Sequence, residues 1–189
     1  MRILWKLYLK LEGWKAVNEF PNHVKKAVII IAPHTHWKDF LIGIGFRSLL
    51  KIKHGKYLGK AELFKGPFGF IFRWLGGTPV DRFSKHGVVE QVVEKLNKAD
   101  KLLIALSPEG TRKKVDKLRT GFYHIAKQAS VPIVMVGLDY SKKELSVSDP
   151  FYTTNDEAAD FRKIVEFFAP LKGYYPEHGM GHLLEEPRA

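Results

Sequence analysis

The 189-residue chain contains no cysteine and no long uninterrupted apolar segment. Without cysteine it cannot form disulfides, thiolate-ligated zinc sites or a cysteine nucleophile, and we expect a reducing compartment. A membrane-spanning helix needs about 20 apolar residues. The longest uncharged stretch, residues 27–37, is shorter and includes two histidines and a proline. We therefore expect no transmembrane span.

Acidic residues are few relative to basic ones: 20 Asp and Glu stand against 31 Lys and Arg, and the formal net charge is +11. This excess favours an anionic partner, which is nucleic acid, an acidic membrane surface or a phosphate-bearing substrate. The chain has neither an aromatic-basic RNA-binding motif nor a helix-turn-helix pattern, so we expect no nucleic acid partner. Apolar residues make up 45% of the chain and charged residues 27%, which are globular proportions.

Residues 2–17 have the periodicity of an amphipathic helix. Its apolar side carries Ile3, Leu4, Leu7, Leu11 and Trp14, and its flank carries Arg2, Lys6 and Lys10. Such a helix either packs on the rest of the domain or lies in the interface of an anionic membrane. Lysines interrupt the apolar stretch and no small-residue cleavage site follows, so we expect no signal peptide. The expected location is cytoplasmic, peripheral on the inner face of the cell membrane.

Short apolar segments alternate with helical ones along the rest of the chain. Strands are predicted at residues 27–32, 56–59, 78–81, 101–106, 131–138 and 145–147, and helices at 37–50, 88–98, 121–128 and 156–168. This alternation predicts an α/β fold, with a mostly parallel or mixed central sheet flanked by helices. We expect a single domain over residues 1–189. It would comprise an N-terminal interfacial helix (1–20), a motif-bearing core (27–140) and a C-terminal strand, helix and tail (141–189).

Polar residues follow the first strongly apolar strand. His34 comes two residues after its end, and Asp39 falls in the first turn of the next predicted helix. On one continuous helix, residues five apart point about 140° away from each other. With His34 in the loop, however, the chain can fold back and the carboxylate can accept the imidazole N–H. Such a pair makes a general base. The alternative is a histidine that only forms hydrogen bonds at the start of the helix.

The histidines also suggest a metal site, because His34 and His36 are separated by one residue. Such sites need three or more ligands, and no second His/Asp cluster follows a predicted strand. His178 and His182 have helical spacing, but Gly179 and Gly181 between them argue against a helix. We therefore expect no metal.

The strand at 101–106 runs into the sequence Ser-Pro-Glu-Gly-Thr-Arg, residues 107–112. Gly110 can adopt a positive φ and bring backbone N–H groups close to a ligand. Arg112 presents a planar fork of donors that suits phosphate. No GxxxxGK[ST], GxGxxG or GxSxG motif is present, so nucleotide hydrolysis, dinucleotide binding and serine esterase chemistry lack their usual supports.

Four blocks of the chain resemble, in order and spacing, the motifs of the glycerolipid acyltransferases, over about residues 27–140. They are His34-x4-Asp39; Lys60-Ala61-Glu62-Leu63 with residues 76–82; Pro108 to Arg112; and Val131 to Val134. The departures from the family pattern are Pro33, His36, Ser107 and Met135.

This resemblance implies transfer of a fatty acyl group from acyl-CoA or acyl-carrier protein to the hydroxyl of a lysophospholipid, most often 1-acylglycerol-3-phosphate. It implies that His34 is the base and that Asp39 orients it. The acceptor phosphate would be bound by Lys60, Arg82 and Arg112, and the acceptor loop would be shaped by Glu109, Gly110 and Thr111. Neither a cofactor nor a metal is required, because a thioester is already activated. The alternatives are a different hydroxyl acceptor, or an anionic-lipid-binding protein without catalysis.

Overall fold

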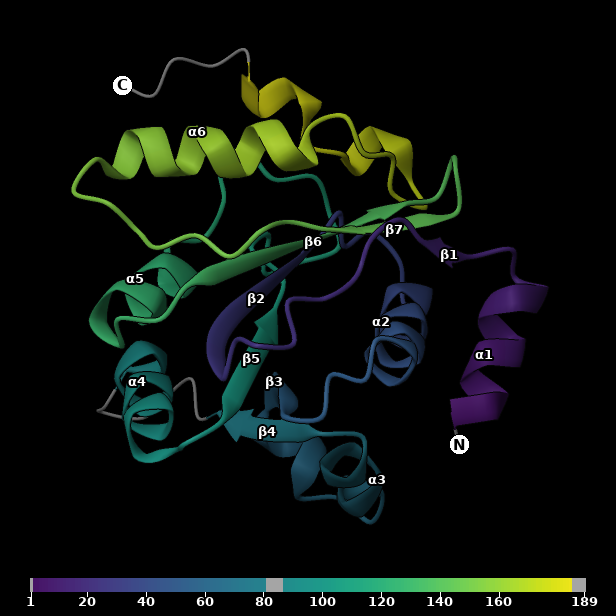
Figure 1. Ribbon diagram of the computed structural model, residues 1–189, viewed down its shortest axis with the longest axis horizontal. Helices are drawn as coiled ribbons and strands as arrows, with labels where there is room; N and C mark the ends of the chain where they lie inside the picture. The colour runs from purple at the N-terminus through teal and green to yellow at the C-terminus, as the bar shows by residue number, and fades with distance from the viewer. Residues whose placement is uncertain (1, 81–86, 185–189) are drawn as a thin grey trace.

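The computed structural model describes residues 2–80 and 87–184, and within them seven strands form one sheet (Figure 1). The strands are β1 (Lys15–Ala16), β2 (Lys26–Ala32), β3 (Gly55–Lys60), β4 (Gly77–Val80), β5 (Leu102–Leu106), β6 (Ile133–Asp139) and β7 (Glu144–Val147). Their order across the sheet is β1-β7-β6-β2-β5-β3-β4. All neighbours are parallel except β6 and β7, which are antiparallel. The predicted α/β class with a mixed central sheet is therefore confirmed.

The three most apolar predicted strands occupy the centre of the sheet, where β2 lies between β6 and β5. Strands buried on both faces need apolar side chains at every position, and every residue of β6 is buried. Since β2, β5 and β6 are parallel, their carboxyl ends lie at the same edge. The loops that follow these three strands therefore meet there.

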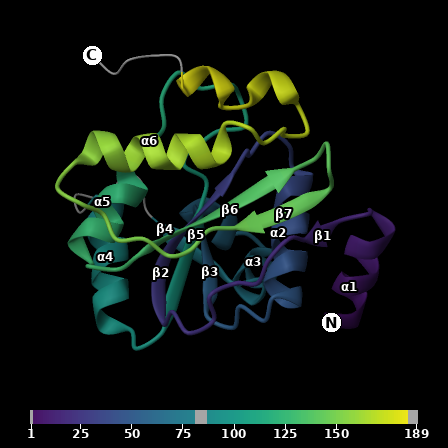
Figure 2. The same cartoon turned by 45° about the horizontal axis from the view of Figure 1, so that its top comes forward.

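Helices cover both faces of the sheet (Figures 1 and 2). They are α1 (Arg2–Leu11), α2 (Lys38–Leu49), α3 (Gly69–Trp74), α4 (Val88–Lys98), α5 (Gly121–Gln128) and α6 (Glu157–Phe168), with 3-10 turns at Ala61–Phe64, Pro176–His178 and Gly181–Leu184. Alternate residues of β2 contribute to two separate cores. Val28 and Ile30 pack with α4, α5 and α6, whereas Ala27 and Ile29 pack with α1 and α2.

The N-terminal helix is shorter than the predicted range 2–17. It ends at Leu11, Gly13 follows with a φ of +79°, and Lys15 and Ala16 pair with β7 instead. Trp14 is only 5% exposed, with its ring against those of Phe46 and Tyr140. The prediction that Trp14 belongs to the apolar side of this helix was therefore wrong: the left-handed Gly13 turns the chain, and Trp14 enters the core.

Most other predicted elements appear within two residues of their expected bounds, and α4 and α5 begin and end at the predicted residues. The predicted strand end at Asp81 lies outside the described residues. None of the described helices combines the length and the apolar character needed to cross a membrane.

Candidate functional site

The loop between β2 and α2 folds back onto the first turn of the helix and brings His34 to Asp39. Oδ2 of Asp39 accepts the backbone N–H groups of Thr35 and His36, each at 2.8 Å. The same oxygen lies 3.1 Å from Nδ1 of His34. The Asp39 side chain is buried, whereas that of His34 is about one-quarter exposed. Asp39 therefore fixes both the loop and the imidazole ring.

Tyr140, directly after β6, completes the surroundings of Asp39. Its hydroxyl donates to Oδ1, the carboxylate oxygen that the loop does not use. Its ring packs edge-on against Trp14 at 4.9 Å and against Tyr174 at 5.5 Å. Burial, and next the hydrogen bond to Asp39, raise the pKa of Tyr140 above its ordinary value, so the hydroxyl keeps its proton and remains a donor. No motif in the sequence pointed to Tyr140 as part of the site.

Glu109, in the turn after β5, holds the histidine loop from the other side. Its carboxylate accepts the backbone N–H of His34 on Oε1 at 3.0 Å and on Oε2 at 2.9 Å, and Oε2 also accepts the Ser107 hydroxyl at 2.9 Å. The residue is only 2% exposed. Burial raises the pKa of Glu109, and the hydrogen bonds from His34 and Ser107 oppose that rise. Glu109 thus joins the loops that follow two adjacent strands.

Gly110 turns the chain sharply after Glu109, with a φ of +68°. A Cβ at this position would lie 3.2 Å from Cγ of Arg119, whose own backbone N–H donates to the carbonyl of Pro108 at 2.8 Å. The hydroxyl of Thr111 accepts the backbone N–H of Lys113 at 3.3 Å. Gly110 and Thr111 are therefore parts of a folded loop at the same edge as His34.

Arg112 is exposed at the end of this loop, and no ion pair within the described residues includes it. Its carbonyl oxygen lies 3.0 Å from Nδ1 of His178, and the carbonyl of Val115 lies 2.9 Å from Nε2 of His182. The two tail histidines thus contact the backbone of the loop. Arg82 falls outside the described residues. Lys60 lies in β3, where the structure describes its backbone but not its side chain.

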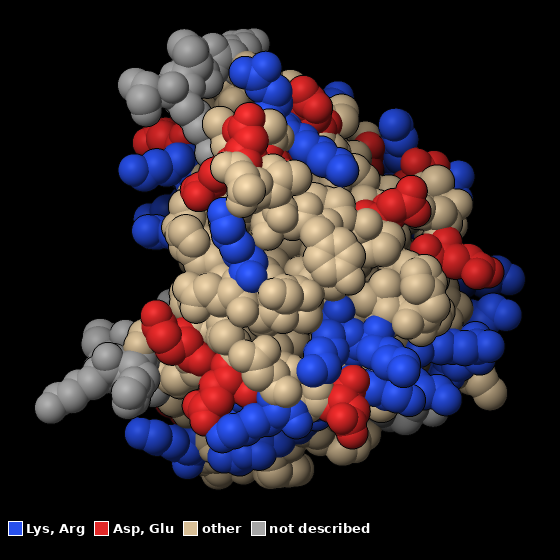
Figure 3. Space-filling view, turned by 60° about the vertical axis from the view of Figure 1, so that its left-hand side comes forward, with Lys and Arg blue, Asp and Glu red and all other residues tan. Residues whose placement is uncertain are grey.

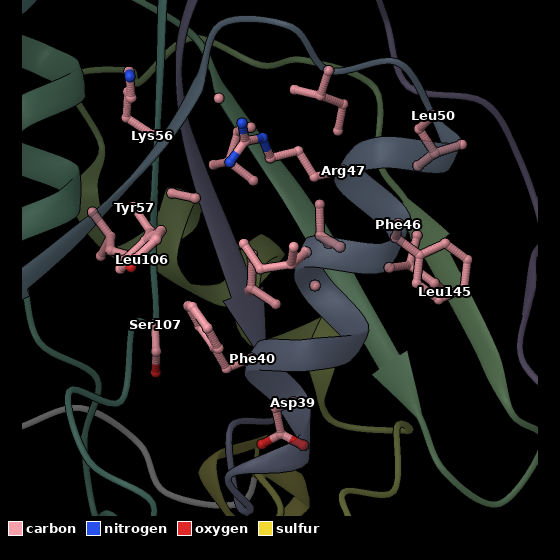
Figure 4. Close-up of a pocket in the computed structure, with 18 of the residues that line it drawn as sticks. Asp39, Phe40, Phe46, Arg47, Leu50, Lys56, Tyr57, Leu106, Ser107 and Leu145 are labelled. Atoms are coloured by element: carbon pink, nitrogen blue, oxygen red, sulfur yellow. The ribbon is translucent and has the colours of Figure 1, made fainter. Parts of the chain in front are cut away.

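An apolar cavity of about 210 Å³ begins at His34, Asp39 and Ser107 and follows α2 (Figure 4). At a rise of about 1.5 Å per residue, the helix from Asp39 to Leu49 spans about 15 Å. Most of the remaining lining is apolar and comes from α2, β2, β3 and β5, including Ile29, Ile31, Phe40, Ile44, Leu58, Ala105 and Leu106. Gly43 also lines the cavity, and a Cβ there would have nothing within 4 Å.

Arg47 is the basic residue of α2 that lines this cavity. It is half-buried, and its guanidinium donates to the carbonyl of Leu75. Burial lowers the pKa of Arg47, a shift that the neighbouring Tyr57 opposes. Figure 4 shows Arg47 well away from Asp39, toward the Leu50 end of the helix. The cavity therefore runs from a polar end, at His34 and Asp39, to an end flanked by a cation.

His36 points into a different environment from His34. Its ring stacks on Tyr174 with centroids 3.9 Å apart and an angle of 12°, and Nδ1 accepts the backbone N–H of Lys38 at 3.3 Å. Over residues 2–80 and 87–184, no group of three or more His, Cys, Asp or Glu has the arrangement of a metal site. The two histidines of the His-x-His pattern thus have different partners: His34 contacts the Asp39 carboxylate and His36 stacks on Tyr174.

A comparison with protein families matches residues 11–139 to the model described as Acyltransferase. The chain belongs to the glycerolipid acyltransferase family. A search of curated proteins found no match. The matched range of this acyltransferase includes every residue of the loops at His34 and Glu109. It ends one residue before Tyr140 and long before Tyr174.

Proposed function

We propose that this acyltransferase moves a fatty acyl group from acyl-CoA or acyl-carrier protein to the hydroxyl of 1-acylglycerol-3-phosphate, in phospholipid biosynthesis. The observation that carries the proposal is the His34–Asp39 pair at the mouth of an apolar cavity. A base is needed to activate the hydroxyl, and an apolar cavity suits the chain of the acyl group.

The pair supplies the proton transfers of the reaction. Asp39 engages Nδ1 of His34, so Nε2 is the nitrogen left to take the acceptor's hydroxyl proton. The alkoxide oxygen attacks the thioester carbonyl carbon, and the tetrahedral intermediate collapses as the carbon–sulfur bond breaks. The thiolate then takes the proton from His34 and leaves as the free thiol. Asp39 stabilises the transient imidazolium and keeps the ring in place.

Lysophospholipid binding is assigned to the edge of the sheet beside His34. Arg112 is exposed there and has no carboxylate partner within the described residues, so its guanidinium is the group we propose for the acceptor phosphate, together with Lys60 and Arg82. Glu109, Gly110 and Thr111 shape the loop that presents Arg112.

We further propose that the protein binds peripherally to the anionic inner face of the cell membrane through α1. The outer side of this helix exposes Ile3, Leu4, Leu7 and Leu11. Its basic residues are Arg2, Lys6 and Lys10, and it contains no acidic residue. Apolar side chains flanked by cations are typical of helices that lie in the interface of an anionic bilayer.

The function is tested by incubating purified protein with acyl-CoA or acyl-carrier protein thioester and a panel of lysophospholipids, and measuring free-thiol release together with the diacyl product. We expect thiol release that depends on acceptor and is fastest with 1-acylglycerol-3-phosphate. Faster reaction with a phosphate-free acceptor would reject the proposed substrate. Vesicle binding without any thiol release would indicate a lipid-binding protein and overturn the catalytic proposal.

A further inference from the structure

Helix α3 and the residue before it expose a cluster of large apolar side chains. Phe68 and Phe70 are each 67% exposed and Trp74 is 63% exposed, with the partly exposed Ile71 beside them. The inner side of the segment is fixed: a Cβ at Gly69 would lie 2.3 Å from the carbonyl oxygen of Phe64, whose ring contacts that of Phe72. The outward position of the exposed side chains is therefore set by close packing on the inner side. An exposed apolar cluster of this kind marks an interaction site.

One residue of this cluster, Trp74, lines the same groove as Trp5 of α1. Three basic residues line the same groove, namely Arg47, Lys51 and Lys53. Figure 1 shows α1 and α3 on the same side of the sheet, near the end of α2. Trp5 of α1 and Trp74 of the cluster thus border one basic groove.

The segment that includes α3 and most of the basic groove carries mainly positive charge. Residues 40–80 contain seven Lys or Arg and one acidic residue, Glu62. By contrast, the side that carries α4 and α5 shows acidic and basic side chains interspersed (Figure 3). An apolar surface surrounded by cations complements a bilayer with anionic headgroups, since apolar residues enter the acyl region and cations remain among the phosphates.

We propose that residues 66–75 form a second membrane-inserting element, in which Phe68, Phe70, Ile71 and Trp74 enter an anionic bilayer while Lys51 and Lys53 bind its headgroups. The inference rests on the proposed attachment of α1 and extends it to two contacts. Two contacts fix the orientation of the protein on the membrane. Ile44, Arg47 and Ile52 line both the basic groove and the apolar cavity, so this orientation places one end of the cavity against the lipid.

The experiment measures co-sedimentation of the full chain with vesicles of equimolar phosphatidylglycerol and phosphatidylcholine. Changing Phe68→Ser and Phe70→Ser together should lower the partition coefficient by about tenfold or more, because the burial of two phenyl rings is lost. Neither residue lines the cavity, so turnover of a soluble short-chain thioester should stay at the wild-type level. Tyr152→Ser is the matched control, since Tyr152 is 65% exposed outside this surface, and it should bind as wild type does.

Trp74 provides a second readout. Lipids brominated in their acyl chains should quench the wild-type fluorescence more than that of Trp74→Phe, and equal quenching would overturn the proposal. A doubly substituted Phe68/Phe70 variant that binds as tightly as wild type would do the same. The proposal would also be overturned if, without lipid, the wild type were a dimer and the Phe68/Phe70 variant a monomer. The cluster would then contact a second copy of the chain.

The variant Ile3→Ser with Leu7→Ser separates this inference from the proposed function. Loss of binding in that variant alone would leave the α1 attachment standing and reject the role of α3. If neither variant lost vesicle binding, both membrane contacts would be rejected. Acyl transfer is measured separately with soluble substrates, so this result would leave the proposed catalytic function untouched.

Discussion

The hydroxyl of Tyr140 donates to Oδ1 of Asp39, although the two residues are 101 positions apart in the chain. The other carboxylate oxygen accepts two backbone N–H groups and faces His34. Both carboxylate oxygens of Asp39 therefore have hydrogen-bond partners. Tyr140 holds the Asp39 carboxylate in place, and Asp39 in turn positions His34, the candidate base.

Tyr140→Phe removes this hydrogen bond and keeps the ring. We expect kcat to fall by about tenfold or more, because a hydrogen bond to a charged group contributes about 1.5–3 kcal/mol. The KM for the thioester should change little, since the role is positioning. Asp39→Asn, which removes the charge itself, should lower kcat by about 10²-fold or more.

Tyr174→Phe is the control for Tyr140, because the rings of the two tyrosines are in contact and no hydrogen bond to Asp39 is lost. It should retain wild-type kcat. Equal kcat values for Tyr140→Phe and Tyr174→Phe would show that the Tyr140 hydroxyl has no part in positioning Asp39.

Gly43→Leu tests the cavity as the site of the acyl chain. The new side chain would enter open space in the cavity, and replacing a helical glycine stabilises a helix by about 0.5–1 kcal/mol. We expect the kcat/KM for long-chain thioesters to fall by about tenfold or more while short-chain thioesters are unaffected. Gly43→Ala, as control, should raise the Tm and keep the long-chain activity. Unchanged chain-length preference in Gly43→Leu would place the acyl chain elsewhere.

Arg112→Ala tests the site of the acceptor phosphate. Loss of a bidentate donor should raise the KM for 1-acylglycerol-3-phosphate by about tenfold, and Arg112→Lys should raise it less because the charge remains without the planar fork. The KM for the thioester should be unchanged. Lys114→Ala, on the exposed part of the same loop, is the control. An equal loss with monoacylglycerol, which has no phosphate, would contradict the assignment.

Glu109 makes the stability depend on pH. Burial raises its pKa above 4.5, the value for an unperturbed carboxyl, so between pH 4.5 and that raised pKa the folded state binds more protons than the unfolded state. The free energy of unfolding should therefore fall as the pH rises through this window. Glu109→Gln cannot titrate and should lack this contribution. Urea unfolding at a series of pH values gives the free energy of unfolding of both proteins, and the difference between them should change with pH. A difference that stays constant across the series would contradict this prediction.

The periodic patterns were sufficient for most of the fold. Helix α4 has valines and a leucine at helical spacing, and β2, β5 and β6 are apolar throughout, so local sequence and tertiary packing agree. The sequence also predicted that His34 and Glu109 each follow an apolar strand. Both lie after parallel strands, and β2 and β5 proved to be neighbours.

Contacts between residues far apart in the chain could not be predicted from periodic patterns. Tyr140 follows β6, which ends at the same edge of the sheet as β2 and β5, and this position was the one indication in the sequence that Tyr140 could belong to the site. The partner of its hydroxyl depends on side-chain packing, which the sequence does not show. The spacing of Trp14 matches the apolar side of a helix, but the helix ends before Trp14 because Gly13 adopts a left-handed conformation. The residues of α3 are mostly apolar, as in a helix buried in a core. The packing of Gly69 against Phe64 shows which of them face outward.

The proposed mechanism depends on His34, which removes the proton from the acceptor hydroxyl. The most direct test is the kcat of His34→Ala with acyl-CoA and 1-acylglycerol-3-phosphate, compared with His36→Ala as the matched control on the same loop. We expect His34→Ala to fold and to lose about 10²–10⁴-fold in kcat, the usual contribution of a general base, while His36→Ala stays within about threefold of wild type. Wild-type turnover by His34→Ala would show that His34 is not the base.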